Sequence, residues 1–160
     1  MNITYSPLSE EIIDYKINWL NNSKVNRYLY GAEDPKKTTL KKQQVWFAKY
    51  QQDNSSKFFT ILVEGKAVGM VGLTKINQLE NVAEIFILVG DENYWNKGIG
   101  THAMNYIIDH AQDNLKLKEL NLSVHKDNIP AIQLFSKIGF NKFSSSEKEI
   151  EMKKNLRETE

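Results

Sequence analysis

Residues 82–104 read VAEIFILVGDENYWNKGIGTHAM, and they are the most informative segment of the chain. The apolar segment Val82–Val89 predicts a buried strand, and a polar loop then leads to Gly98 and Gly100, where a helical pattern begins. A loop of this kind leaves several backbone N–H groups unpaired at the positive end of the helix. Because glycine lets a phosphate approach the main chain closely, the segment predicts an anion site.

The two glycines are weak evidence when taken alone. The loop is not a P-loop, because no Lys-Ser/Thr pair follows Gly100, and two glycines are too few for a dinucleotide fingerprint. The alternative is structural: Gly98 and Gly100 would merely permit a tight turn from strand to helix. The rest of the chain has to decide between the two.

A second segment supplies the decision. It follows a predicted strand at 118–125 and has the spacing Asn128-x-x-Ala131-x-x-Leu134-Phe135-x-x-x-Gly139-Phe140. This spacing describes a short helix with a glycine at its exit. Together the two segments resemble the GNAT superfamily of N-acetyltransferases, whose Arg/Gln-x-x-Gly-x-Gly/Ala motif and later Asn…Ala…Leu-Tyr…Gly-Phe block occur here in order, within a resemblance that covers about residues 3–154.

The predicted order of elements is β-α-α-β-β-β-α-β-α-β-β, which matches that family. The first helix starts near Ser9 and ends at Asn21-Asn22-Ser23, and a polar segment follows it. The other predicted helices are 38–52, 98–114 and 129–138, and the predicted strands are 2–6, 58–63, 67–76, 82–89, 118–125 and a final pair over 140–152. We expect an α/β fold with a mixed, mostly antiparallel sheet of six to seven strands and about four helices, in one domain over 1–160 with a charged tail.

Composition excludes several classes of protein. The 160 residues carry 21 Lys+Arg against 20 Asp+Glu, so the charge of +1 gives no footprint for nucleic acid. The absence of cysteine excludes a disulfide framework and a thiol nucleophile, and no metal is expected because His, Asp and Glu show no ligand spacing. The polar N-terminus and the lack of a run of about 20 apolar residues predict a soluble, cytoplasmic protein without a membrane segment.

The resemblance implies acetyl-CoA as the donor. In the family, amides of the glycine loop hold the diphosphate, the pantetheine arm runs beside the fourth strand, and an asparagine contacts the pantetheine. The implied acetyl-CoA-binding residues are Leu88, Val89, Asn96, Lys97, Gly98, Ile99, Gly100, Thr101 and Asn128. Trp95 stands where the family motif has Arg or Gln, so any side-chain contact made there is altered.

Glu84 is the candidate catalytic residue. It is a lone carboxylate in an otherwise apolar strand, and desolvation by its neighbours would raise its pKa and suit it to take a proton from an attacking ammonium. Family members often carry the general base at this position. The alternative is that Glu84 is solvated near the start of the strand and is merely structural. His125, which shares a strand face with Asn121, is a second candidate base, although a surface position suits it better.

Phe135 departs from the family, in which a tyrosine often protonates the leaving thiolate. Phenylalanine cannot donate a proton, so Ser136, a water molecule or no dedicated acid would take that role. The aromatic residues Tyr28 and Trp46 fall in the region that builds the acceptor side in the family, although most such residues are core.

These observations predict direct transfer of an acetyl group from acetyl-CoA to a primary amine. The form of the motif and residues 20–28 resemble the branch of ribosomal-protein and amino-sugar-nucleotide acetyltransferases, so an amino-sugar nucleotide or a protein N-terminus is the expected acceptor. Polyamines and antibiotics are the other candidate acceptors, and relatives are often homodimers. One alternative is a catalytically weak acyl-CoA sensor. Another is a module that binds a different anion, but this leaves Asn128 unexplained.

Overall fold

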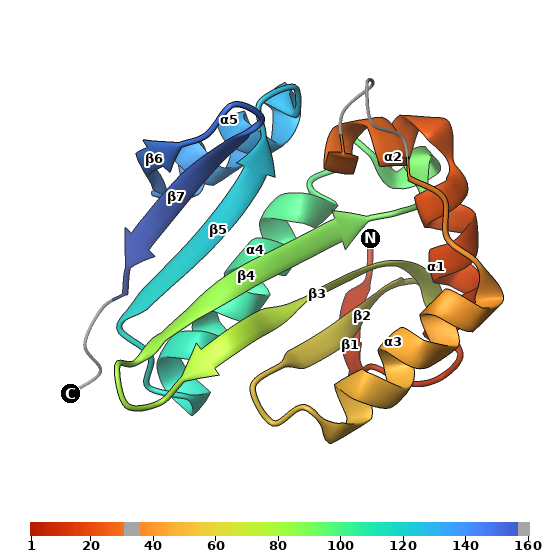
Figure 1. The fold of residues 1–160 in the computed structure, drawn as a ribbon, viewed down its shortest axis with the longest axis horizontal. Helices are drawn as coiled ribbons and strands as arrows, with labels where there is room; N and C mark the ends of the chain where they lie inside the picture. The colour runs from red at the N-terminus through yellow and green to blue at the C-terminus, as the bar shows by residue number, and fades with distance from the viewer. Residues whose placement is uncertain (31–35, 157–160) are drawn as a thin grey trace.

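A computed structural model describes residues 1–30 and 36–156. Seven strands form one mixed sheet in the order β1-β2-β3-β4-β5-β7-β6, in which only the β4–β5 pairing is parallel. Figure 1 shows the strands side by side, with the helices on both faces of the sheet. The strands are β1 Ile3–Pro7, β2 Lys57–Val63, β3 Lys66–Asn77, β4 Val82–Val89, β5 Glu119–His125, β6 Asn141–Ser145 and β7 Glu149–Asn155.

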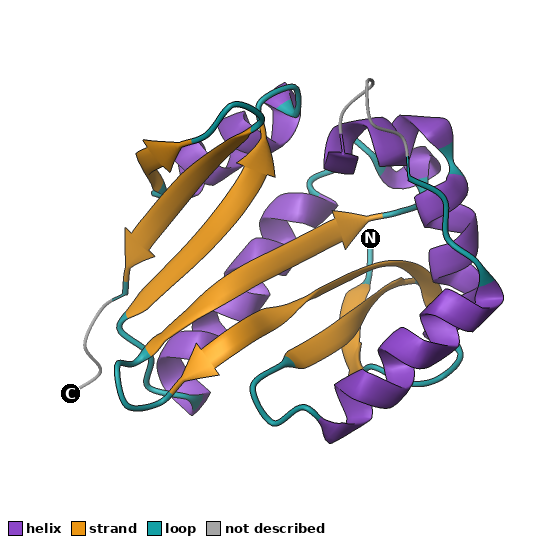
Figure 2. Cartoon of the chain, in the orientation of Figure 1, coloured by secondary structure: helices purple, strands orange, loops and turns teal. Residues whose placement is uncertain are grey.

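Five α-helices cover this sheet in the described residues, and Figure 2 separates them from the strands by colour. They are α1 Ile12–Asn21, α2 Ser23–Tyr30, α3 Leu40–Gln52, α4 Ile99–Asp109 and α5 Ile129–Ile138. A short 3₁₀ turn, Glu92–Tyr94, precedes α4, and a π-helical turn, His110–Asn114, follows it. The predicted mixed sheet is confirmed and has seven strands. The described residues contain one α-helix more than the four that were expected.

Two apolar cores lie on opposite faces of the sheet. One core packs α4 and α5 against the sheet, and it includes Ile107 of α4 and Phe135 of α5. The other packs α1 and α2 against the opposite face through Trp19 and Val25, which contact a cluster that includes Leu88 of β4. The alternation along β4 explains this division, because successive side chains of a strand point to opposite faces.

β4 and β5 pair over only part of their length. The paired residues are Val82 with Glu119, Ala83 with Leu120 and Glu84 with Asn121. Beyond these pairs β4 continues to Val89 and β5 to His125, and the two strands diverge (Figure 1). The sheet therefore splits at its centre, at the carboxyl ends of both strands.

The extra helix, α2, corrects the prediction of a polar segment after Asn21-Asn22-Ser23. Asn22 ends α1, since its N–H donates to Trp19 O, and it also caps α2, because its Oδ1 accepts from Lys24 N at 2.9 Å. One asparagine thus ends one helix and starts the next. The predicted start of α1 near Ser9 is also wrong, because α1 begins at Ile12 and its N-cap, Glu11, makes no side-chain hydrogen bond.

Other predicted boundaries are confirmed. Thr39 caps α3 by accepting from Lys42 N, and α5 ends at Gly139, whose φ of 111° is the left-handed conformation that glycine adopts easily. In residues 1–30 and 36–156, none of the helices combines the length and the apolar character that crossing a membrane requires.

Asn26 fixes α2 to its surroundings. Its side chain is only 4% exposed, and its Nδ2 donates to the carbonyl oxygens of Leu20 and Lys36 while its Oδ1 accepts from Lys36 N at 3.1 Å. Within residues 1–30 and 36–156, these backbone groups have no other hydrogen-bond partner, and their setting is partly buried. Asn26 therefore holds α1, α2 and the chain before α3 in one arrangement.

We predict that Asn26→Ala lowers the free energy of unfolding by about 1–3 kcal/mol, because it leaves buried backbone groups unpaired. Urea unfolding followed by circular dichroism measures this change. Asn18→Ala is the matched control: Asn18 is exposed on α1, so that variant should stay within about 0.5 kcal/mol of the wild type. Equal stabilities for the two variants would contradict the proposed role of Asn26.

Lys16 is a buried cation. Its side chain lies beneath α3 with Nζ 3.3 Å from the centroid of the Trp46 ring, and the residue is 6% exposed. Burial lowers the pKa of Lys16 from its usual 10.5 to about 8. The folded protein therefore releases this proton at a pH about 2.5 units lower than the unfolded chain does.

Between pH 8 and 10.5 the unfolded chain binds more protons at Lys16 than the folded protein, so this residue makes stability rise with pH in that window. We predict that the unfolding free energy of the wild type increases relative to that of Lys16→Met across it. Urea unfolding at several pH values measures the difference. Lys41→Met, a change at an exposed lysine of α3, should show no such trend, and a constant difference for Lys16→Met would contradict the lowered pKa.

Candidate functional site

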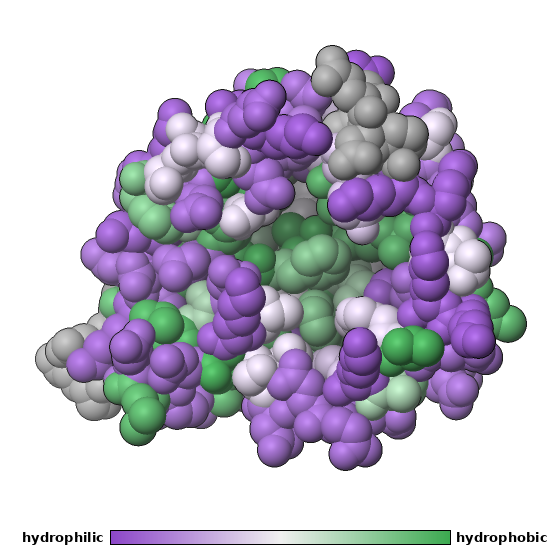
Figure 3. Space-filling view, viewed as in Figure 1, coloured by the Kyte–Doolittle hydropathy of each residue, from purple (hydrophilic) through white to green (hydrophobic). Residues whose placement is uncertain are grey.

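A cavity of about 370 Å³ opens where β4 and β5 diverge. This volume is within the range of small-molecule sites. Figure 3 shows a hollow on this face, with apolar residues in its depth and hydrophilic residues around its rim. The lining residues come from α2, β4, the loop before α4, and α5: Val25, Tyr28, Leu29, Ile87, Leu88, Val89, Tyr94, Trp95, Asn96, Gly98, Ile99, Gly100, Thr101, Asn128, Pro130, Ala131, Leu134 and Phe135.

The glycine loop presents a row of free donors to this cavity. Asn96 and Gly98 have φ values of 60° and 80°, so the chain reverses in the left-handed conformation before α4 begins. Within the described residues, the amides from Asn96 to Thr101 donate to no acceptor; the first paired amide is that of His102, which donates to Gly98 O. Free amides at the positive end of an eleven-residue helix suit a diphosphate.

Backbone groups of β4 form the second set of donors and acceptors. Gly90 N donates to Val68 O of β3 at 2.9 Å. Because neighbouring residues of an antiparallel strand direct their N–H and C=O groups to alternate sides, Leu88 also faces β3, whereas Val89 and Ile87 face the split. The edge of β4 beyond Glu84 thus offers unpaired peptide groups to a ligand that lies along it, as an additional strand would.

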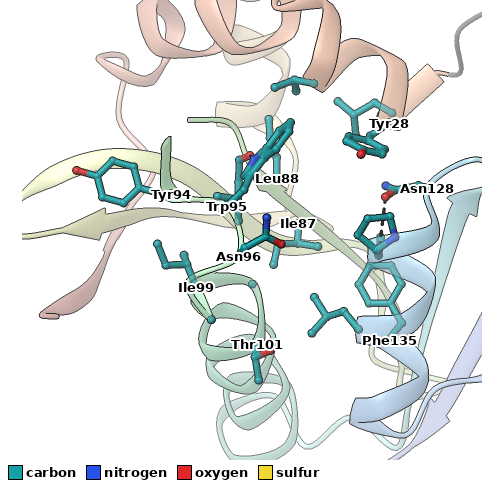
Figure 4. A pocket seen from close by; sticks show the side chains of 18 residues that line it. Tyr28, Ile87, Leu88, Tyr94, Trp95, Asn96, Ile99, Thr101, Asn128 and Phe135 are labelled. Atoms are coloured by element: carbon teal, nitrogen blue, oxygen red, sulfur yellow. Dashed lines mark hydrogen bonds between the residues drawn. The ribbon is translucent and has the colours of Figure 1, made fainter. Parts of the chain in front are cut away.

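Trp95 caps one of these groups. Its indole Nε1 donates to the Val89 carbonyl at 2.7 Å, and the Tyr28 ring lies edge-on to the Trp95 ring at 5.6 Å. Figure 4 shows Trp95 beside Leu88, at the wall of the pocket. The residue that departs from the expected motif therefore joins the end of β4 to α2.

Close packing fixes the end of β4 from the other face. A side chain at Gly90 would collide with the Trp19 ring, since a Cβ there would come within 2.2 Å of it. Only glycine fits this contact between α1 and the strand. The position of the cavity wall thus depends on the packing of α1.

Asn128 starts α5 and lines the cavity at the same time. Its Oδ1 accepts from Ala131 N at 3.3 Å as an N-cap, which is the dashed contact in Figure 4. The Nδ2 group is left to donate to a ligand.

The structure brings most of the sequence-predicted donor-binding residues together. The residues that line the cavity are Leu88, Val89, Asn96, Gly98, Ile99, Gly100, Thr101 and Asn128. Lys97 does not line it, and its Nζ lies 5.5 Å from the centroid of the Tyr94 ring. Leu88 lines the cavity, but its peptide groups face β3. It was expected to offer backbone hydrogen bonds to the pantetheine, and this direction does not allow them.

Glu84 lies outside the lining of the cavity, in the last residue pair before the split, where it is paired with Asn121. The expected enclosure by apolar neighbours is wrong, because the side chain is 40% exposed and its Oε1 lies 3.4 Å from Lys75 Nζ. The reason is its place near the start of β4, where its partners are polar. Asn121 Oδ1, on the same face, is buried without a partner among the described residues.

The other candidates of the acyl-transfer step are also placed. Phe135 lines the cavity at 5% exposure, and its ring packs on Phe140. Ser136 is exposed and lies outside the lining, so the structure does not support it as a substitute acid. The His125 side chain is 13% exposed rather than on the surface, and its Nδ1 accepts from Asp127 N.

The sequence placed Tyr28 in the region of the acceptor side but did not predict the α2 wall of the cavity, which consists of Val25, Tyr28 and Leu29. These residues recur at the i, i+3, i+4 spacing of a helix face, a signal that was present in the sequence. The polar Asn-Asn-Ser run before them concealed it. Among the described residues, no group of three His, Cys, Asp or Glu side chains could hold a metal ion.

The comparisons with known proteins agree with this geometry. The model of the Acetyltransferase (GNAT) family matches residues 18–140. The chain is 31% identical over 139 residues to the spermidine N(1)-acetyltransferase of Escherichia coli K12, an alignment that covers 87% of this chain and 73% of the relative. It is 27% identical over 136 residues to the acetyltransferase PseH of Campylobacter jejuni, covering 85% and 81%.

Among solved structures, the spermidine N-acetyltransferase of Vibrio cholerae in complex with CoA and spermine superposes with a TM-score of 0.82 at 20% identity, covering 96% of this chain and 95% of the other. This likeness extends the agreement in fold to nearly the whole chain. The chain therefore belongs to the GNAT family of acetyltransferases, and it is an N-acetyltransferase that uses acetyl-CoA as its donor.

Proposed function

We propose that this enzyme acetylates a primary amine of a small aliphatic polyamine. The observation that carries the acetyl-transfer part is the split between β4 and β5, which joins free amides at the α4 N-terminus to an unpaired strand edge. The polyamine part is supported by the E. coli spermidine N(1)-acetyltransferase, which is 31% identical to this chain in an alignment that covers 87% of it. An amino-sugar nucleotide and a protein N-terminus are the other acceptors to test.

In this proposal the donor lies along the split. The amides from Asn96 to Thr101 bind the diphosphate, and Ile87 and Val89 replace Leu88 and Val89 as the backbone partners of the pantetheine, because their peptide groups face the split. Asn128 donates its Nδ2 to the same arm. Lys97 contributes its backbone N–H to the loop, and its side chain stays outside the cavity.

The acetyl carbonyl then lies deeper in the split, close to the last β4–β5 pair. The N–H of Ile87, which faces the split beyond the last β4–β5 pair, stabilises the oxyanion that forms when the amine attacks, since a fixed backbone donor needs no reorganisation. Glu84 lies next to this point and takes the proton from the acceptor ammonium through water. Catalysis otherwise depends on holding the two substrates in line.

Turnover with different amines tests the acceptor. The chain contains no cysteine, so a thiol reagent reports only the CoA that is released. We predict thiol release with spermidine and acetyl-CoA, and little release with an amino-sugar nucleotide or a peptide. Mass spectrometry of the acetylated product excludes simple hydrolysis. If the nucleotide sugar or the peptide is the faster acceptor, the polyamine proposal is wrong and the donor assignment is unaffected.

Glu84→Gln tests proton removal. The substitution keeps the size of the side chain and removes the base, so we predict that kcat/KM for the amine falls by about 10²-fold while the affinity for acetyl-CoA is unchanged. Glu80→Gln is the matched control, because Glu80 is exposed just before β4. Unchanged turnover in Glu84→Gln would assign Glu84 a structural role, that of partner to Lys75.

A further inference from the structure

Phe135 lines the cavity on the α5 side of the split, and its side chain has no hydroxyl group that could donate a proton. When the tetrahedral intermediate collapses, the electron pair of the C–S bond moves to sulfur, and the resulting thiolate gains a proton. A thiol pKa near 8.5 makes this a fair leaving group, so a donor is useful without being indispensable. With phenylalanine at position 135, a proton donor has to come from another side chain on the cavity wall.

Of the described residues that line the cavity, three carry a hydroxyl group: Tyr28, Tyr94 and Thr101. Thr101 belongs to the first turn of α4, among the amides that suit the diphosphate, which is the opposite end of the donor from its sulfur. Tyr94 has Lys66 Nζ and Lys97 Nζ each 5.5 Å from the centroid of its ring. Figure 4 shows Tyr94 directed away from Asn128 and Phe135, so neither hydroxyl suits the sulfur.

Tyr28 has the remaining hydroxyl, and its surroundings fit the role. It lies on α2, across the cavity from the glycine loop and on the same side as Asn128 in Figure 4. Among the described residues its hydroxyl makes no hydrogen bond, so both its proton and its lone pairs are available to a ligand. The group is partly buried and lines the path of the donor.

The ring of Tyr28 is held in place by anchored neighbours. Trp95, against which it lies edge-on, is fixed by its own hydrogen bond to the Val89 carbonyl. The helix that carries Tyr28 is fixed by the buried Asn26. A side chain supported in this way can present its hydroxyl in one orientation, which proton transfer requires.

We propose that Tyr28 protonates the sulfur of CoA as it leaves, an inference that rests on the proposed acetyl transfer. The amine nitrogen forms its bond to the carbonyl carbon and loses its protons to Glu84 and water. The C–S bond breaks, the sulfur takes the phenolic proton of Tyr28, and the tyrosinate regains a proton from water. Starting from the ammonium, the net products are the N-acetyl amine, CoA thiol and one proton released to water, so the step is balanced without a further reactant.

Tyr28→Phe tests this role. It removes one hydroxyl and leaves the ring on Trp95, so we predict that kcat falls at least about tenfold while the KM for acetyl-CoA and the unfolding temperature stay close to those of the wild type. Tyr15→Phe is the matched control, since Tyr15 is 39% exposed on α1 and outside the cavity. An unchanged kcat in Tyr28→Phe, with an active wild type, would overturn the inference.

A second variant separates proton donation from a structural effect. Phe135→Tyr supplies a phenol from the α5 side of the same cavity, so we predict that Phe135→Tyr restores turnover to Tyr28→Phe. A purely structural loss at residue 28 gives no such rescue, and that result would count against proton donation. An inactive wild type, with no thiol release from any amine, would instead refute the proposed function.

Discussion

The parallel pairing of β4 with β5 ends after Glu84 and Asn121, and the rest of the site follows from that interruption. Every buried peptide group of a sheet needs a partner, and β5 no longer supplies one to the edge of β4 that continues toward Val89. A ligand that carries amides can pair there as a strand would. The free edge leads directly to the free amides before α4, so one continuous surface offers hydrogen-bonding partners to an amide chain and to a diphosphate.

Packing on both faces keeps this interrupted edge in place. α4 and α5 are buried against one face of the sheet, and α1 and α2 against the other, where Trp19 fits against Gly90 and Trp95 holds the Val89 carbonyl. The cost of an open strand edge is therefore offset by apolar burial behind it. The glycine loop needs little side-chain chemistry, and Trp95 can stand at the first position of the motif without removing the donors.

The sequence predicted the parts of the fold that depend on periodicity and on turns. The strand at 82–89, the loop at Gly98 and the helix that ends at Gly139 follow from local patterns, and the structure confirms them. α2 was missed because Asn22 both ends α1 and caps α2. At Asn22 the residue types that end a helix are the same as those that start one. Only the hydrophobic spacing of the following residues distinguishes a new helix from a loop.

The site was predictable to a similar extent. The motif residues lie close together because the loop before α4 and the start of α5 both border the split. This arrangement follows from the order of the elements along the chain, which the sequence predicted. Three features of the site depend on strand register and on the placement of the helices, which motif spacing does not encode. They are the exposure of Glu84, the direction of the Leu88 peptide groups and the position of Tyr28 in the cavity wall. The hydrogen bond from Trp95 to the Val89 carbonyl could not be predicted either, because it forms only when the turn between these two residues brings them together.

Hydrogen exchange of the backbone amides, with and without CoA, shows whether the donor pairs with the open edge of β4 and with the loop before α4, because a bound ligand slows exchange at the groups that it pairs. Binding of CoA along the split predicts slower exchange at Ile87, Val89 and residues 96–101 when CoA is added, and little change at the outer strands β1 and β6. Protection confined to another region, such as the second cavity lined by Lys36, Lys42 and Gln43, would contradict it.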